Sequence, residues 1–235
     1  MNSQLDHLIV AAQTLSQGVQ WCEETFGITP TAGGEHDKFG THNRLFKIAT
    51  PKYPMAYLEI IAINPAAPLP KSQKNKRWFD LDDPRIQRAI AKTPRLIHMV
   101  ANTTDIQADR QALREQQIER GSVIHASRKT NKGRLQWQIT VREDGERLFD
   151  GTLASLIQWG KEDAAEPLRL HPRNTLPRSG VSLQSLHITH PSAAKLQKAY
   201  DTLGLQHVAI QEGAANLCAT FNSPKGLVQL ESLGL

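Results

Sequence analysis

Short apolar segments and one amphipathic segment follow one another in a fixed order at the start of the chain. Residues 5–12 are apolar and rich in β-branched side chains, which predicts a strand. A helix is predicted over residues 15–26, where apolar side chains recur about once per turn and Gly27 follows at the position that favours glycine. Three more strand segments lie around residues 29–32, 43–49 and 56–63. The predicted order is β-α-β-β-β.

The same order begins again twice. The second stretch has a strand at 96–101, a helix at 106–118, and strands at 122–127, 134–142 and 153–159. The third has a strand at 183–189, a helix at 192–203, and strands at 207–211, 215–222 and 227–233. Each first strand carries a histidine, and His98 follows His7 by 91 residues while His187 follows His98 by 89. This spacing indicates an internal repeat.

The repeat predicts an α+β fold. The units span residues 1–64, 95–160 and 182–235, and linkers span 65–94 and 161–181. One β-α-β-β-β unit cannot cover its own sheet, so we expect two units to pair into a cupped mixed sheet with their helices outside. The third unit then lies at an edge or in a dimer interface. The first linker is long for a structureless connection and is expected to hold a short helix around residues 84–91.

Composition narrows the class of protein. Apolar residues make up 39% of the 235 residues, enough for a sizeable core, and the longest apolar runs are too short to span a bilayer. No signal peptide is predicted, and two cysteines without metal-ligand spacing suit a cytoplasmic protein with free thiols. The net charge is +5, but the densest basic run, residues 71–77, lies in a Pro-flanked loop. We therefore expect neither a nucleic-acid nor a membrane partner.

Histidine and glutamate recur on the strands that are expected to lie at the centre of each unit. Imidazole and carboxylate together suit Zn²⁺, Fe²⁺, Mn²⁺ or Ni²⁺. Glu59 is the more informative residue, because a carboxylate buried in an apolar strand needs a cation, a metal or solvent. The alternative is that Glu59 faces solvent and that each histidine is a core residue bonded to a backbone carbonyl. The residues on the first and last strands are His7 with Glu59, His98 with Gln158, and His187 with Glu231.

Other polar residues can also reach the cup. Arg128 would clamp an anion and Trp137 would form a wall, unless they are a surface arginine and a core tryptophan. Asn43 reaches the mouth of the cup or caps a turn. His36 follows two glycines and is expected in a mobile loop. No serine or cysteine lies in a nucleophile motif.

Several short segments together resemble the glyoxalase-like branch of the vicinal oxygen chelate superfamily. They are Leu5-Asp-His-Leu-Ile-Val, Phe39-Gly-Thr-His-Asn-Arg, Tyr57-Leu-Glu-Ile-Ile-Ala, Arg77-Trp-Phe-Asp-Leu-Asp, Ser127-Arg128 before Gly133-Arg-Leu-Gln-Trp, and Phe149-Asp-Gly before Leu156-Ile-Gln-Trp. The resemblance implies paired β-α-β-β-β units around a site that usually holds a divalent metal. Its ligands would be His7, Glu59, His98 and Gln158 if units one and two pair, or His7, Glu59, His187 and Glu231 if units one and three pair. Consecutive units are usually neighbours, which favours the first pairing and His7, Glu59 and His98 as metal ligands.

The function predicted from this resemblance is a metal-dependent enzyme of the lyase, isomerase or dioxygenase type. It would act on a small oxygen-rich substrate, with Glu59 as the catalytic base and Zn²⁺, Ni²⁺, Mn²⁺ or Fe²⁺ as cofactor. Asn43, Arg128, Trp137 and Gln158 would contact the substrate. The alternative is a metal-free protein that binds or sequesters a small molecule in the same cup. A homodimer is expected in either case.

Overall fold

The computed structural model describes residues 3–67, 76–130, 133–160 and 171–235. The first unit contains β1 (Gln4–Ala11), α1 (Leu15–Phe26), β2 (Thr31–His36), β3 (Thr41–Lys47) and β4 (Tyr57–Ile63). The second contains β5 (Arg95–Asn102), α3 (Ile106–Glu115), β6 (Ser122–Thr130), β7 (Gly133–Val141) and β8 (Ser155–Trp159). The third contains β9 (Ser182–Thr189), α5 (Ala193–Leu203), β10 (Val208–Gln211), β11 (Asn216–Ser223) and β12 (Gly226–Glu231). The predicted order of elements is confirmed in all three stretches.

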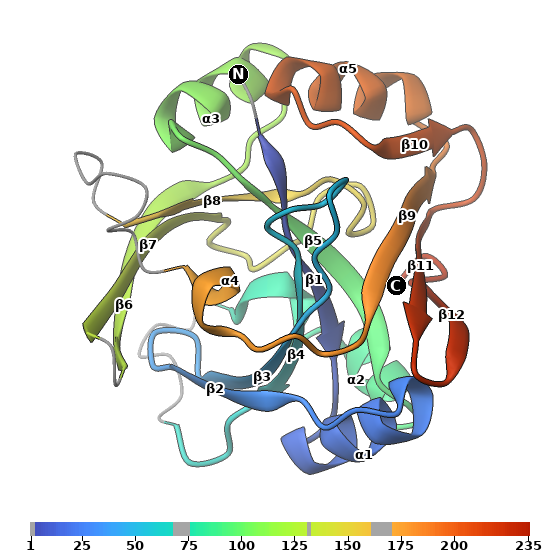
Figure 1. The fold of residues 1–235 in the computed structure, drawn as a ribbon. Coiled ribbons are helices and arrows are strands. Elements are labelled where there is room, and N and C mark those ends of the chain that lie inside the picture. Colours follow the sequence, from blue (N-terminus) through green and yellow to red (C-terminus); the bar gives the residue numbers. More distant parts are fainter. Residues whose placement is uncertain (1–2, 68–75, 131–132, 161–170) are drawn as a thin grey trace.

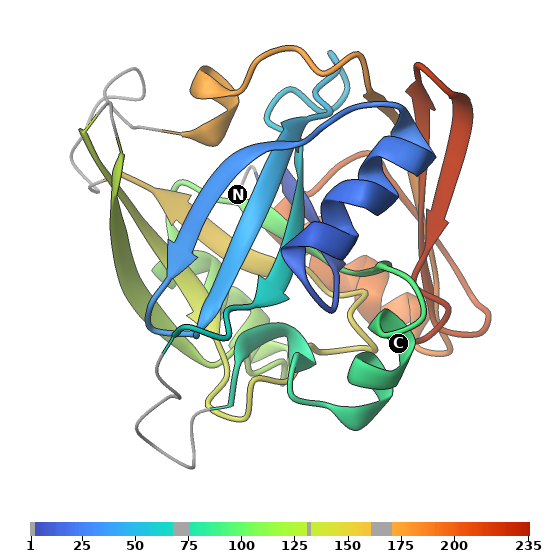
Figure 2. The ribbon, with the colours of Figure 1, turned by 90° about the horizontal axis from the view of Figure 1, so that it is seen from below.

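The first two units form one eight-stranded mixed sheet with the order β2-β3-β4-β1-β5-β8-β7-β6. The units meet where β1 and β5 pair in antiparallel fashion. The sheet curls until its edge strands β2 and β6 come together, and the ammonium of Lys38 donates to the carbonyl of His125 at 2.7 Å across this seam. Figures 1 and 2 show the resulting cup between the blue strands of unit one and the green strands of unit two.

Helices cover the outside of the cup. Helix α1 packs against β3 and β4, and α3 packs against β7 and β8. Thr14 caps α1 by accepting from the amide of Gln17, and Gly27 ends it in the left-handed region with φ of 74°. One apolar cluster lies between the sheet and its outer layer, and a second, built around Trp78, Phe79, Trp137 and Trp159, fills part of the cup.

The connections between the units have structure of their own. The first holds a 3₁₀ turn, η1 (Trp78–Asp80), and then α2 (Pro84–Ile90), which confirms the short helix expected there. The second holds α4 (Pro172–Thr175), a single turn that follows His171. Both segments return to the cup and contribute side chains to it, so they are more than spacers.

The third unit forms a separate four-stranded sheet whose order, β10-β9-β11-β12, differs from that of unit one. It packs outside β5, and α5 packs against α3. Its first and last strands are not neighbours, because β11 lies between them. The expectation that the first and last strands of every unit lie at the centre is therefore wrong for the last strand of unit three, because β12 lies at the edge of the sheet. Among the described residues, no helix is long and apolar enough to cross a membrane.

Candidate functional site

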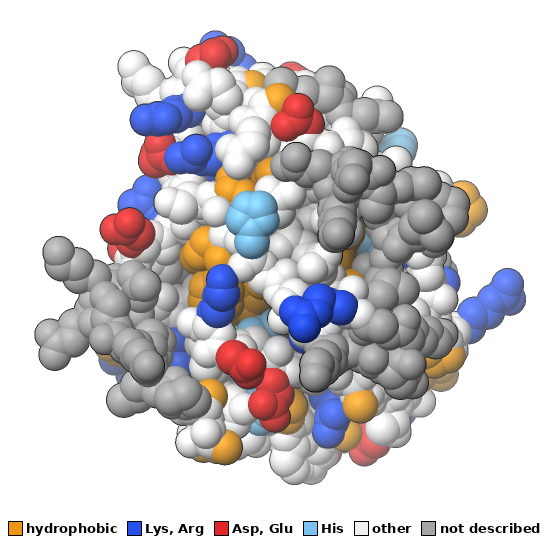
Figure 3. Space-filling view, turned by 90° about the vertical axis from the view of Figure 1, so that its left-hand side faces the viewer, with side chains coloured by type: hydrophobic (Ala, Val, Ile, Leu, Met, Phe, Trp, Pro, Cys, Tyr) orange, Lys and Arg blue, Asp and Glu red, His pale blue; other side chains and the backbone are white. Residues whose placement is uncertain are grey.

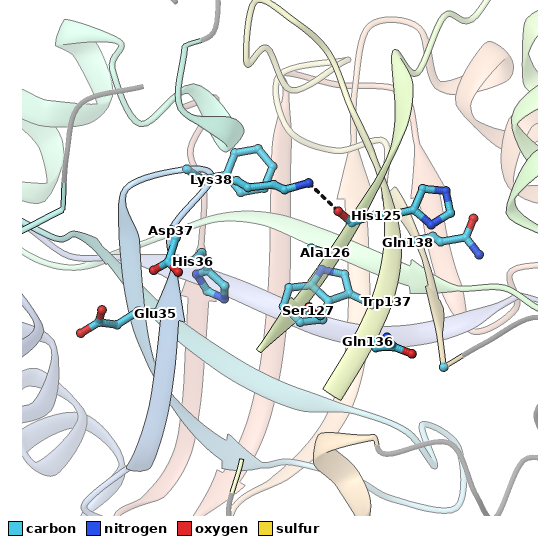
Figure 4. A pocket seen from close by; sticks show the side chains of 12 residues that line it. Glu35, His36, Asp37, Lys38, His125, Ala126, Ser127, Gln136, Trp137 and Gln138 are labelled. Atoms are coloured by element: carbon cyan, nitrogen blue, oxygen red, sulfur yellow. Dashed lines mark hydrogen bonds between the residues drawn. The ribbon is translucent and has the colours of Figure 1, made fainter. Parts of the chain in front are cut away.

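The polar part of the cup surrounds a small buried cavity of about 30 Å³, which is room for one or two waters. A wider cleft of about 820 Å³ adjoins it at the seam between β2 and the β6–β7 hairpin. His36 and Trp137 line both spaces. Figure 4 shows these two rings turned toward one another, whereas Gln136 and Gln138 point away from them.

A β-bulge in β1 creates the central pair of the site. Leu5 lies opposite Ala101 and His7 lies opposite Val100, so Asp6 is the extra residue. In a regular strand consecutive side chains point to opposite faces. The bulge instead lets Asp6 and His7 approach one another, and the Nδ1 of His7 is 2.6 Å from Oδ1 of Asp6.

Three further donors hold the other oxygen of Asp6. Oδ2 accepts from Nε1 of Trp159 at 2.8 Å, from Nδ2 of Asn102 at 2.9 Å and from Nε2 of His171 at 2.9 Å. Burial would raise the pKa of this carboxyl, but the charges and hydrogen bonds of His171 and His7 outweigh burial and hold the pKa far below its usual range. Asp6 is therefore a fixed anion that positions His7.

Glu59 lies on the cavity side of His7. Its Oε2 is 3.4 Å from Nε2 of His7, and its Oε1 accepts from Nδ2 of Asn43 at 2.5 Å. Burial would lower the pKa of His7, but hydrogen bonds with Asp6 and Glu59 raise it to about 9. Burial would raise the pKa of Glu59, but His7, His36 and Asn43 lower it to about 2. At neutral pH the site is a buried imidazolium between two carboxylates.

His36 is a second histidine at the cavity, and it lies on strand β2 rather than in the loop expected from the sequence. Its Nε2 is 3.4 Å from Nδ2 of Asn43 and 4.0 Å from Oε1 of Glu59, while Nδ1 is 3.1 Å from Oγ1 of Thr41. Burial lowers the pKa of His36 to about 4. The site thus pairs a charged histidine with a neutral one.

Arg128 brings an unused donor to the same cavity. It lines the cavity, and its Nη1 atom is buried without a hydrogen-bond partner among the described residues. A Cβ on Gly34 would lie 1.9 Å from that nitrogen, so the guanidinium packs directly against the backbone of β2. A buried guanidinium N–H group without an acceptor favours an anion in the adjoining space.

Comparison with known proteins bears on this geometry. A sequence model of the glyoxalase-like domain family matches residues 5–204. The chain belongs to the glyoxalase-like domain family. The match ends after α5, before strands β10 to β12. No curated protein matches the chain at a significant level.

A solved structure supports the fold of this glyoxalase-like protein, and two further matches have lower TM-scores. A hypothetical protein from Staphylococcus aureus is 17% identical, with 98% of this chain and 85% of that chain covered and a TM-score of 0.59. Methylmalonyl-CoA epimerase from Streptomyces coelicolor is 17% identical over 67% of this chain and 98% of its own, at a TM-score of 0.41. The Mycobacterium tuberculosis epimerase is 18% identical over 68% and 89%, at 0.39. At 17% identity, the likeness to the Staphylococcus aureus protein concerns the fold alone.

The second unit of the glyoxalase-like protein places its predicted ligands away from the cavity. The Nδ1 of His98 donates to the carbonyl of Gly151 at 2.7 Å, and its Nε2 is 2.9 Å from Oγ of Ser155. Gln158 is buried on the opposite face, where its Oε1 accepts from the amide of Ile106 at the start of α3. Both ring nitrogens of His98 are engaged, which matches the alternative of a satisfied core histidine.

The residues present do not fit the divalent metal that the superfamily resemblance implies. Of the predicted set, only His7 and Glu59 meet, and the part of the chain that the structure describes contains no group of three His, Cys, Asp or Glu residues suited to a metal ion. His187 and Glu231 offer no substitute. They lie on either side of Cys218 in the sheet of unit three, away from the cup.

Sequence reasoning missed Asp6, Trp159 and His171 and misplaced His36. Asp6 sits beside His7 in the sequence, but an alternating strand would turn it outward, and nothing in the pattern signals the bulge. His171 precedes Pro172 in a Pro-rich linker, a helix-capping arrangement that a search for ligands restricted to strands passes over. Asn43, Arg128 and Trp137 line the cavity, and their contacts with a substrate stay a prediction.

Proposed function

We propose that this glyoxalase-like protein is an enzyme of the isomerase or lyase type that moves a proton on a small anionic, oxygen-rich substrate. One observation supports this proposal above the others. His7 and Glu59 of the Asp6–His7–Glu59 chain border the same cavity as Arg128, whose Nη1 atom is buried without a partner among the described residues. Such a reaction requires charged groups that transfer a proton and, beside them, a hydrogen-bond donor that is free to bind an anion.

The two adjoining spaces suggest where the parts of a substrate bind. The inner cavity of about 30 Å³ admits a group no larger than a carboxylate or a carbonyl with its neighbouring carbon. The outer cleft of about 820 Å³ has room for the remainder of the molecule. In this proposal Arg128 pairs with the anionic group, and Trp137 is the wall between the two parts.

Glu59 acts as the base in this proposal, and substrate binding activates it. In the free site its pKa is about 2 because His7 and Asn43 hold its charge, so it is a weak base. When a substrate oxygen accepts the hydrogen bond from Nε2 of His7, Glu59 loses its contact with that nitrogen. The loss of this contact raises the pKa of Glu59. His7 then stabilises the negative charge that develops on the substrate oxygen as Glu59 removes the neighbouring proton. Glu59 returns the proton to complete an isomerisation.

Asp6 has a supporting part. It holds the ring of His7 through Nδ1, so that Nε2 faces Glu59 and the cavity. A carboxylate behind a histidine fixes the ring orientation and favours the imidazolium form. The proposal includes neither a resident metal nor the dioxygenase type, because the residues at the cavity do not form the ligand set that both need.

The test combines binding with hydrogen exchange. Small carboxylates that carry an acidic C–H, such as malonate, malate, oxaloacetate and methylmalonate, are screened by thermal shift and then incubated with protein in D₂O. We expect at least one to stabilise the protein and to exchange its C–H for deuterium in ¹H NMR. Glu59→Gln should keep binding and lose exchange, whereas Arg128→Leu should lose binding.

The controls separate the alternatives. Arg134→Leu removes an exposed arginine from the same hairpin and should behave as the wild type. Binding that depends on Arg128 without exchange of any bound compound would indicate the metal-free binding protein instead. Exchange that disappears with EDTA and returns with Zn²⁺, Ni²⁺, Mn²⁺ or Fe²⁺ would show that the metal-free mechanism is wrong. Exchange that survives in Glu59→Gln would remove Glu59 as the base.

A further inference from the structure

Arg120 is a buried cation without an anionic partner. It is 3% exposed and makes a 2.5 Å hydrogen bond from Nη2 to Oγ of Ser155. Its Nε and Nη1 atoms are buried and have no acceptor among the described residues. No carboxylate in the described part of the chain forms an ion pair with it. A buried charge left in this state is costly, so a missing group is expected.

The contacts around Ser155 have a fixed direction. The carbonyl of Gly151 can only accept, so Nδ1 of His98 carries the proton. Burial holds the pKa of His98 well below its ordinary value, so the ring is neutral and its Nε2 accepts from the hydroxyl of Ser155. The oxygen of Ser155 then accepts from Arg120. The hydroxyl of Ser155 donates its proton to His98, and neither residue carries a negative charge that could balance the charge of Arg120.

A very small cavity lies beside this chain. Its volume is about 10 Å³, which corresponds to one water-sized probe. Arg120, Arg142 and Arg147 all line it, together with the hydroxyl-bearing Thr140 and Ser155. Three guanidinium groups therefore border a space of this size, and their carboxylate partners decide how much positive charge is left there.

Two of the three arginines already have carboxylate partners. Asp80 pairs with Arg147 at 3.0 Å. Arg142 pairs with Asp144 at 2.5 Å and with Glu146 at 3.4 Å, and Glu146 also borders the cavity. The charge that remains unbalanced is that of Arg120. The side chains of Arg142 and Glu146 are 25% and 55% exposed, so this side of the cavity gives a small ion a route from solvent.

We propose that this cavity binds one monoatomic anion of halide size, chloride under cellular conditions, on Arg120. A water molecule would accept hydrogen bonds from Nε–H and Nη1–H but would leave the charge in place. Phosphate and sulfate carry four oxygens and exceed the space. The site is separate from the proton-transfer cavity, but Trp78 and Phe79 line both, so the anion supports the wall between them.

The experiment measures thermal unfolding in sodium bromide against sodium gluconate at equal ionic strength. At bromide about a hundredfold above its dissociation constant, we expect the wild-type Tm to rise by roughly 5 °C relative to gluconate. Arg120→Met should show no halide-specific rise. Arg114→Met, which removes an exposed arginine of α3, should keep the full rise.

Crystals grown in bromide provide a second readout that does not need a variant. An anomalous peak beside Arg120 and Ser155 is expected. Equal Tm values in the two salts, an unchanged rise in Arg120→Met, or a crystal whose only density at the cavity is a water would each overturn the proposal. If Arg120→Met does not fold, the anomalous map of the wild type decides. None of these results depends on whether Glu59 transfers a proton.

Discussion

Replacing Asp6 by Asn should make the loss of folding stability at alkaline pH much smaller, because Asp6 raises the pKa of His7. The pKa of His7 is raised from 6.5 to about 9 in the folded chain, after its contacts with Asp6 and Glu59 outweigh burial. A group whose folded pKa is raised contributes its full stabilisation below the unfolded value and loses it as the pH rises through the folded value. The contribution of His7 is therefore complete below pH 6.5 and gone above about pH 9.

The contribution of His7 to the unfolding free energy follows from its pKa shift. At about 1.4 kcal/mol per pKa unit, a rise from 6.5 to about 9 corresponds to about 3 kcal/mol of unfolding free energy. Two neutral buried histidines act in the opposite sense. The pKa values of His36 and His98 are lowered by burial, so acidification below pH 6.5 protonates them first in the unfolded chain and destabilises the fold. Stability should therefore be highest near pH 6.5.

Urea unfolding between pH 5 and 9.5 measures the loss of unfolding free energy on both the acid and the alkaline side. Asp6→Asn should lose roughly 3–5 kcal/mol near pH 6.5, because it removes a buried charge partner, and should show a much smaller loss on the alkaline side. Asp80→Asn is the matched control. It removes the carboxylate partner of the buried Arg147, which does not titrate in this range, so it should destabilise equally at pH 6.5 and 9. A wild type with flat stability over this range refutes the reasoning, as does a His7 NMR titration midpoint near 6.5.

Three further substitutions test other parts of the structure. Gly34→Ala places a methyl group where Arg128 now lies, so ligand binding measured by calorimetry should fall about tenfold or more while the far-UV spectrum is unchanged. His98→Ala should cost about 2 kcal/mol in urea unfolding because it leaves buried groups unpaired, whereas His187→Ala, on the sheet of unit three, should stay within about 0.5 kcal/mol. Tyr200→Phe removes the hydroxyl bonded to the Thr152 carbonyl and should lower unfolding free energy by about 1 kcal/mol, and an unchanged midpoint would contradict that bond.

Periodicity was sufficient to predict most of the elements, because most of them bury an apolar face of a defined period, whereas β2 has no fully buried residue and runs further than expected, to His36. Helix α1 was predicted with its observed bounds, since Thr14 and Gly27 stop it at both ends. The strand order of unit three was not predictable from the same information. Its elements have the order of unit one, but pairing is decided by which edges meet in space, and β9 there pairs with β10 and β11.

The candidate site was predicted in part for a similar reason. His7, Glu59 and Asn43 share one unit, and their positions follow from strand alternation within it. His98 lies on the equivalent strand of unit two, but its contacts with Gly151 and Ser155 come from a turn and a neighbouring strand that its local sequence does not describe. The homodimer and the cytoplasmic location stay predictions.

The bulge in β1 makes the chemistry depend on the length of one strand. Deleting Asp6, the single residue between Leu5 and His7, would remove this break in the pairing of β1 with β5, and the sheet would lose none of its strands. Nδ1 of His7 would then lose its carboxylate partner, and Glu59 would be the one carboxylate left beside the ring. Descendants of this fold that lack the extra residue would therefore keep the cup and lose the charged chain. Strand length offers a physical criterion for sorting related chains into those that keep this chemistry and those that only bind.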